Sequence, residues 1–125
     1  MYTFRRHLTV FLAALAVGTV VEIVAAVLHL WVYSPRFLVA LNVVLFFGLV
    51  MSGTAAVLQS RHPAFSYVAG FLLGYGYEWL NITVLHWWHF PDDRLLCFQG
   101  LPVIAFVVAL GWGAVASGLR FIWRP

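Results

Sequence analysis

Long apolar runs alternate with short polar breaks along this chain. The runs span approximately residues 8–33, 37–59, 64–88 and 101–122. Each run has about 20 residues or more, the length that an α-helix needs to cross a bilayer core. Strands of a membrane β-barrel would be shorter and would alternate in polarity. The pattern predicts an all-α protein with one domain, residues 1–125, folded as an integral membrane bundle of four transmembrane helices.

The first apolar run could also be taken for a signal peptide, because Arg5 and Arg6 precede it. It continues to about Trp31, which is too long for the apolar part of a signal peptide and long enough to span a membrane. We therefore expect it to form the first transmembrane helix. No internal repeat is evident in the sequence.

The composition supports a membrane location. Hydrophobic residues make up 64% of the chain and charged residues 9%, whereas a soluble domain has about 25% charged residues. The basic residues are all arginine and are scattered, so no nucleic-acid partner is expected. The single cysteine, Cys97, cannot form an internal disulfide or a thiolate pair.

The arginines predict an orientation. One side of the bundle would carry five of them: Arg5, Arg6, Arg61, Arg120 and Arg124. The other side would carry Arg36 and Arg94, the latter in the predicted loop beside Asp92 and Asp93. This bias predicts that the N- and C-termini are cytoplasmic, and we expect a bacterial cytoplasmic (inner) membrane.

Aromatic residues gather near the ends of the predicted helices: Trp31, Tyr33, Trp87, Trp88, Phe90 and Trp123. Tryptophan and tyrosine are enriched where a membrane meets water. For most of these residues the simplest interpretation is anchoring at that interface.

Two glutamates lie inside predicted spans. Glu22 and Glu78 each fall about two residues beyond the expected centre of the first and third helices, at about 1.5 Å per residue. These two helices should run in the same direction, so the carboxyl groups are at equal depth and can be neighbours. An ionisable group at that depth costs at least about 2.5 kcal/mol on insertion scales, so it is expected to be paired, protonated or functional.

Other polar and aromatic residues are expected beside the glutamates in the outer half of the bundle. Small residues such as Gly18, Gly70 and Gly74 would let the helices approach closely. The candidate ligand-binding residues are Asn42, Tyr75, Asn81, His86, His89 and Trp88, with Tyr77 nearby.

The candidate catalytic residues are Glu78, Glu22 and His29. Two close carboxyl groups in a low dielectric should not both ionise, so one is expected to hold a proton while the other stays charged beside a histidine. That pairing suits proton transfer to a lipid-soluble substrate. The alternative is a hydrogen-bond network that only holds the helices together.

A metal or haem site is a second interpretation. His86 and His89 have the spacing of ligands on adjacent helical turns, and Asp92 or Asp93 follows. The simpler explanation is that both histidines lie at the membrane interface. We therefore assign no metal ligands, and the sequence identifies no cofactor.

The stretch from Glu78 to Gly113 resembles carotenoid-biosynthesis membrane proteins, a family that includes carotenoid 1,2-hydratase-like enzymes. It covers roughly a third of the chain. The family shows a helix glutamate, an aromatic-x-aromatic segment, a Gly-x-Pro turn and a later tryptophan. The matching positions here are Glu78, Trp88 with Phe90, Gly100 with Pro102, and Trp112.

Part of this stretch is also similar to the small subunits of heterodimeric lycopene cyclases. Those subunits carry two acidic residues after the proline, where this chain has Val103, Ile104 and Ala105. The resemblance implies acid-catalysed hydration or cyclisation of a polyene, with Glu78 as proton donor and Glu22 or His29 as its partner.

Three classes of function stay open at this stage. The first is an enzyme, or enzyme-like module, that acts on an apolar lipid or isoprenoid. The second is a non-catalytic subunit or pigment-binding partner within a larger membrane complex. The third is a proton-coupled carrier, which would need a homo-oligomer because four helices rarely enclose a transport path.

Overall fold

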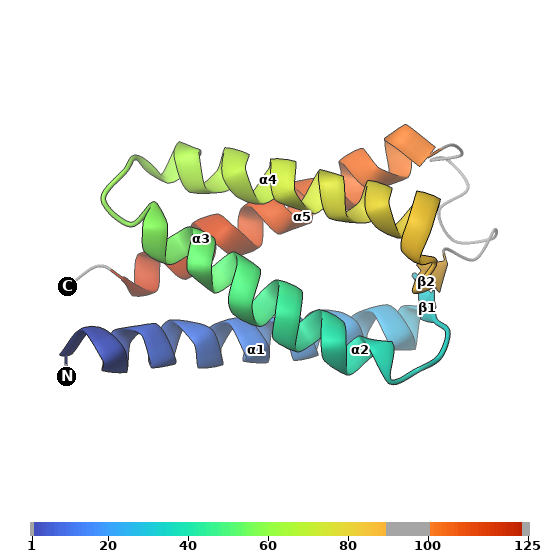
Figure 1. Cartoon of the computed structure of the whole chain (residues 1–125), viewed down its shortest axis with the longest axis horizontal. Helices are drawn as coiled ribbons and strands as arrows, with labels where there is room; N and C mark the ends of the chain where they lie inside the picture. The colour runs from blue at the N-terminus through green and yellow to red at the C-terminus, as the bar shows by residue number, and fades with distance from the viewer. Residues whose placement is uncertain (1, 90–100, 124–125) are drawn as a thin grey trace.

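A computed structural model describes residues 2–89 and 101–123, and these residues are mostly helical. The described residues form four helices, as predicted (Figure 1). The first is α1 (Tyr2–Leu28). The second is continuous and comprises α2 (Leu38–Leu41), the π-helix η1 (Asn42–Met51) and α3 (Ser52–Val57). The third joins α4 (Pro63–Leu80) to a short π-helix, η2 (Asn81–Leu85), and the fourth is α5 (Leu101–Ile122).

Two helices are shorter than the apolar runs predicted. The runs were expected to reach residues 33 and 88, but α1 ends at Leu28 and η2 ends at Leu85. The next residues, His29 and His86, have left-handed backbones with φ of 53° and 52°. At the end of α1, the His29 and Leu30 amides bond to carbonyls three and five residues back, which is a Schellman cap. A left-handed residue there turns the chain out of the helix.

Each of these turns leads into a two-residue strand. β1 (Val32–Tyr33) and β2 (Trp88–His89) pair antiparallel, with Val32 opposite His89 and Tyr33 opposite Trp88. The strand pair joins the first and third helices at the end of the bundle opposite the chain termini (Figure 1). The predicted loop residues Pro91 to Arg94 lie outside the described residues.

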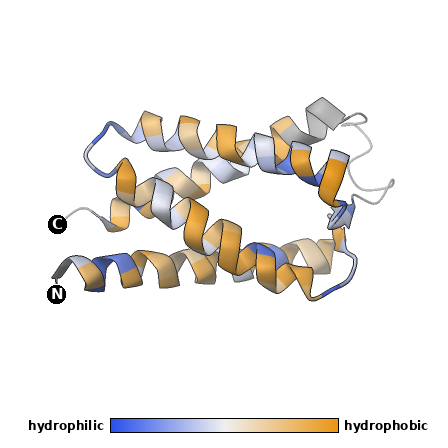
Figure 2. Cartoon of the chain, in the orientation of Figure 1, coloured by the Kyte–Doolittle hydropathy of each residue, from blue (hydrophilic) through white to orange (hydrophobic). Residues whose placement is uncertain are grey.

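Apolar side chains cover the outside of the bundle. Large ones are at least half exposed on helices throughout the chain, among them Phe4, Val20, Val57, Leu72 and Phe106. Figure 2 shows the same apolar character along the helices. Two helical segments, Thr3–Leu28 and Leu38–Val57, are long and apolar enough to cross a membrane. Both termini lie at one end of the bundle (Figure 1).

The four helices form two hairpins that repeat one arrangement. The first hairpin is residues 2–57; the second is residues 63–89 and 101–123. In the first, a Cβ on Gly18 would lie 2.6 Å from Phe47 of the following helix. In the second, a Cβ on Gly74 would collide with Trp112 of the following helix. Each glycine stands four residues before a buried glutamate, Glu22 or Glu78.

On the second helix of each hairpin, a glycine likewise packs closely against the first helix. A Cβ on Gly48 would lie 2.8 Å from Phe11, and a Cβ on Gly113 would lie 2.8 Å from the Tyr67 carbonyl and 3.0 Å from its ring. Gly48 directly follows Phe47, as Gly113 follows Trp112. The prediction that the chain contains no internal repeat is therefore wrong.

Candidate functional site

The Glu22 carboxyl group is buried, with 7% of the residue exposed, and accepts three hydrogen bonds. Tyr33 Oη donates to Oε1 over 2.7 Å and Asn42 Nδ2 to the same oxygen over 2.8 Å. Trp31 Nε1 donates to Oε2 over 3.0 Å. Both carboxyl oxygens are thus surrounded by donors, an arrangement that stabilises a negative charge.

A fourth side chain orients one of these donors. Tyr77 Oη, from α4, donates to Asn42 Oδ1 over 2.7 Å, so the Asn42 amide presents its nitrogen to Glu22. Asn42 is 2% exposed. The relay Tyr77 to Asn42 to Glu22 links three helices through polar groups, and such fully satisfied buried networks specify one packing arrangement.

The Tyr33 hydroxyl is buried where it donates to Glu22. The Tyr33 ring is also packed against Trp88, with the ring centroids 5.4 Å apart. The strand pair thus brings a protonated phenol from β1 to a carboxyl group on α1.

Glu78 is more deeply buried, with 2% of the residue exposed, and it accepts two hydrogen bonds. Trp88 Nε1 donates to Oε2 over 3.1 Å, and Trp112 Nε1 donates to Oε1 over 3.3 Å. An indole N–H can only donate. The two donors are neutral, and both bonds are longer than those that Tyr33 and Asn42 make to Glu22.

Both carboxyl-bearing residues line one cavity of about 280 Å³. Both glutamates therefore border the same space. Asn42 supplies the other polar side chain of the wall, and Trp31, Trp88 and Trp112 supply indoles. The rest of the wall is apolar and comes from Val21, Leu30, Phe47, Val107, Val108, Gly111 and Val115.

A larger groove of about 780 Å³ lies between α1 and the following helix. Glu22 and Trp31 line both this groove and the inner cavity, so they form a common wall. His29 and Arg36 line the groove, together with apolar residues of both helices. Glu22 is therefore adjacent to two spaces, and Glu78 to the inner one.

Four predicted site residues lie together: Glu22, Asn42, Glu78 and Trp88 all line the inner cavity. His29, predicted to be catalytic, instead lines the groove, and its side chain is exposed. It still shares the groove with Glu22, but it is absent from the wall that holds both glutamates.

The Asn81 side chain is hydrogen-bonded to the backbone of Trp87 and Trp88. Its Oδ1 accepts from the Trp87 and Trp88 amides over 2.8 and 3.2 Å, and its Nδ2 donates to the Trp88 carbonyl over 3.0 Å. It thereby joins the end of α4 to β2, where Trp88 must stand to reach Glu78. His86 and His89 are exposed at this turn and do not line the cavity.

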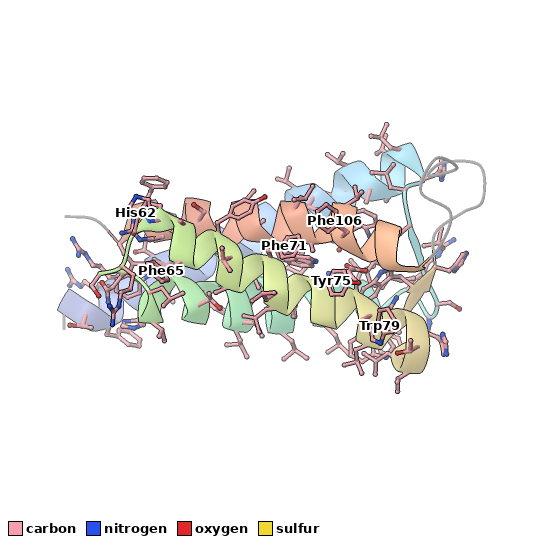
Figure 3. All side chains as sticks on the ribbon, turned by 90° about the horizontal axis from the view of Figure 1, so that it is seen from above. His62, Phe65, Phe71, Tyr75, Trp79 and Phe106 are labelled. Atoms are coloured by element: carbon pink, nitrogen blue, oxygen red, sulfur yellow. The ribbon has the colours of Figure 1, made fainter. Side chains whose placement is uncertain are left out.

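Tyr75 lies on another face. Its ring is stacked between Phe71 and Trp79 at centroid distances of 6.3 and 6.4 Å. Figure 3 shows these three residues along one side of α4. Tyr75 therefore does not line the cavity that holds both glutamates.

Two residues of the site were interpreted otherwise from the sequence. Trp31 and Tyr33 were expected to be interface anchors, as was Trp88 in addition to its candidate role, but all three donate to a glutamate. These residues follow their glutamates by 9, 11 and 10 positions, so a continuous helix would place them about two and a half to three turns beyond the carboxyl groups. The left-handed turns and the strand pair fold them back, a local feature that apolar periodicity does not reveal.

A signal for these residues exists in the sequence. Val-Leu-His-x-Trp occurs at 27–31 and again at 84–88, and aromatic-Gly-x-Val-x-Ser-Gly occurs at 47–53 and at 112–118. The first motif follows Glu22 by five residues and Glu78 by six. The π-helix η2, at Asn81–Leu85, absorbs the additional residue, since such segments arise as single-residue insertions into α-helices.

No group of three metal-ligating side chains occurs within residues 2–89 and 101–123. The motif residues Phe90 and Gly100, and the candidate ligands Asp92 and Asp93, lie outside that part of the chain. Pro102 belongs to α5. Comparison with protein-family models, curated proteins and solved structures finds no match to this chain.

Proposed function

We propose that this protein is a multi-pass membrane protein whose four helices all cross the bilayer, with both termini in the cytoplasm. The exposed apolar side chains on the helices support this, because a soluble monomer rarely exposes large contiguous apolar surface. The arginine bias supports the orientation. Alkaline extraction of membranes and reporter fusions at each terminus test it; a protein released by alkali, or termini on the outer side, would contradict it.

We further propose that the inner cavity binds part of an apolar, isoprenoid-type lipid and that the two glutamates perform acid–base chemistry on it. One observation carries this proposal: Glu22 and Glu78 share a cavity whose remaining wall is almost wholly apolar and aromatic. Ionisable residues inside a membrane are rare and mark functional sites. A purely structural network would not need two carboxyl groups facing one space.

The chemistry would begin with proton donation to a carbon–carbon double bond. The O–H bond of an acid breaks, the π electron pair forms the new C–H bond, and the other carbon becomes a cation. Indole rings and the second carboxylate stabilise that cation. The first carboxylate then takes back a proton, either from a carbon beside the cation or from a water molecule that adds to it. The net reaction is isomerisation or hydration. If the π electrons of a second double bond in the same molecule first form a C–C bond to the cation, the positive charge moves to that double bond, and proton loss beside it gives cyclisation.

The size of the spaces suggests how a lipid would be held. The inner cavity, at about 280 Å³, is at the small end of ligand sites and suits the end of a chain. The adjacent groove of about 780 Å³ could hold more of the same molecule, because Glu22 and Trp31 border both spaces. A lipid would then enter sideways from the bilayer.

The resemblance to carotenoid-biosynthesis proteins fits this class of ligand. Three of its positions meet at one point, because Trp88 and Trp112 both donate to Glu78. These residues are ten and 34 positions away from Glu78 in the sequence. Their convergence is what a shared site for polyene chemistry requires.

A steric block tests the ligand. A Cβ added to Gly111, which lines the cavity, or to Gly118 on the same helix meets no atom within 4 Å. We expect Gly111→Leu to fill the cavity, so protein purified from membranes should lose a lipid that wild-type protein and Gly118→Leu retain. Organic extraction, absorption spectra and mass spectrometry provide the measurement. Equal lipid content in all three proteins would refute the site.

A further inference from the structure

The two hairpins place a carboxyl group at the same position but surround it differently. The shared element is the indole: Trp31 donates to Glu22, and Trp88, its counterpart in the repeated motif, donates to Glu78. The structural counterparts of Gly18 and Phe47 are Gly74 and Trp112. These pairs align the hairpins, so the remaining neighbours of each glutamate can be compared one by one.

The additional donors of the first hairpin have no equivalent in the second. Counting from the aligned Phe47 and Trp112, Asn42 corresponds to Val107, and both Val107 and Val108 line the cavity. Tyr33 corresponds in the repeated motif to Phe90, which has no hydroxyl group. The second hairpin instead has the Trp112 indole, where the first has Phe47.

We propose that this divergence divides the charge between the two carboxyl groups: Glu22 is held as the carboxylate, Glu78 carries the exchangeable proton, and Tyr33 and Asn42 are the positioning residues that enforce the division. The assignment rests on the proposed function, because it takes the bilayer to keep both groups from water. It goes further by naming the proton donor and the residues that select it.

The three hydrogen bonds that Glu22 accepts favour its charged form over its protonated form. Oε1 faces Tyr33 and Asn42, and the Asn42 amide is held in its donating orientation by Tyr77. Oε2 faces the Trp31 indole, which cannot accept. A proton on Glu22 Oε1 could be donated only to the Tyr33 oxygen, and the Tyr33 hydroxyl would then lose the acceptor that it has in this structure.

Glu78 accepts fewer and longer hydrogen bonds than Glu22. Its two donors are indoles at 3.1 and 3.3 Å, and neither a hydroxyl nor an amide group donates to it among the described residues. A second negative charge in the cavity that Glu22 already lines would meet repulsion in a low dielectric. Paired carboxyl groups with different surroundings take acid and base roles in this way.

Infrared spectroscopy of the full-length protein tests the assignment without a substrate. A protonated carboxyl group has a C=O stretching band separate from that of a carboxylate. The chain has four acidic side chains, so the Asp92→Asn, Asp93→Asn double variant isolates the two glutamates. In that background, purified in lipid vesicles, we expect one acid band at neutral pH. At neutral pH the band should disappear in Glu78→Gln. In Glu22→Gln the band should persist as the pH is lowered.

The positioning residues are tested in the same background. Tyr33→Phe combined with Asn42→Val makes the first hairpin resemble the second, and should produce a second acid band that Glu22→Gln removes. Tyr33→Phe alone keeps the ring and is the milder variant if the double change prevents folding; it should shift the Glu22 titration measurably. A band that belongs to Glu22 in the starting protein, or a titration unmoved by Tyr33→Phe, would overturn the assignment.

Failure of this assignment and failure of the proposed function are distinguishable. Loss of bound lipid is measured with Gly111→Leu, whereas the proton is located from the infrared band. Lipid bound specifically with the proton on Glu22 would refute only the charge division. A proton on Glu78 with no lipid retained would refute only the ligand site.

Discussion

The two hairpins show what a repeated scaffold fixes and what it leaves free. Both bring a helix against its successor through a glycine, Gly18 or Gly74, and both bury a glutamate one turn later. Both then fold a tryptophan back to that glutamate. Only the remaining donors differ. Backbone packing therefore sets where the carboxyl groups stand, and a few side chains set their chemistry.

The close helix contacts are the feature most sensitive to substitution. Gly74→Leu inserts a side chain into Trp112, and Gly18→Leu inserts one into Phe47. Overpacking typically costs about 1–3 kcal/mol and sometimes more. We expect both variants to unfold at markedly lower temperature in detergent, or not to accumulate. Gly76→Leu is the control, because a Cβ there meets no atom within 4 Å. A normal melting temperature for Gly74→Leu would show that the hairpin contact is wrong.

Loss of Asn42, a donor that the second hairpin lacks, should have the next largest effect on stability. Asn42→Val removes a donor from Glu22 and also leaves the Tyr77 hydroxyl without its acceptor. Leaving buried polar groups unsatisfied costs about 1–3 kcal/mol. Unfolding in mixed micelles should report a loss of that size, while Leu45→Ala, on the exposed face of the same helix, should lose less. If Asn42→Val is as stable as wild type, the relay does not form.

Trp31→Phe and Trp88→Phe compare the two equivalent indoles directly. Each variant removes one hydrogen bond to a glutamate, worth about 1 kcal/mol or somewhat more. Trp88 is 6% exposed and also packs against the Tyr33 and Tyr77 rings, whereas Trp31 is half-buried. The Trp88 variant should therefore be the less stable of the two in the same micelle assay. The reverse order would indicate that the hairpins are not equivalent at this position.

The smallest effect is expected at the left-handed turns. His29 and His86 adopt positive φ, which glycine adopts without steric cost. His29→Gly and His86→Gly should leave the melting temperature unchanged or raise it slightly. A conserved melting temperature together with full lipid retention would identify His29 as a structural residue. Loss of lipid from His29→Gly alone would instead support its predicted role beside Glu22.

The four helices followed from the sequence because they depend on the spacing of apolar residues. The same count predicted that Glu22 and Glu78 could meet, and both line one cavity. The return of Trp31, Tyr33 and Trp88 to the carboxyl groups depends on two backbone angles at histidine, which periodicity does not encode. Helix geometry could have placed Asn42 beside Glu22. It could not have predicted the orientation of the Asn42 amide, because that orientation depends on Tyr77 from a distant helix.

The repeat escaped detection because its identities are few and one residue is inserted between Glu78 and the second Val-Leu-His-x-Trp motif. Aligned by contacts, Gly18 with Gly74 and Phe47 with Trp112, the correspondence becomes visible. The close contacts of Gly18 and Gly74 are thus kept between the hairpins, while many other positions differ.

The sharing of one cavity by Glu22 and Glu78 is tested most directly by a double-mutant cycle. The free energy of unfolding in mixed micelles is measured for wild type, Glu22→Gln, Glu78→Gln and the double variant, with Glu22→Gln and exposed His89→Ala as the control pair. Neighbouring groups couple by about 0.5–3 kcal/mol, and distant ones add within about 0.5 kcal/mol. We predict coupling in that range for the glutamates and additivity for the control. Additive effects of the two glutamate substitutions would contradict a shared cavity.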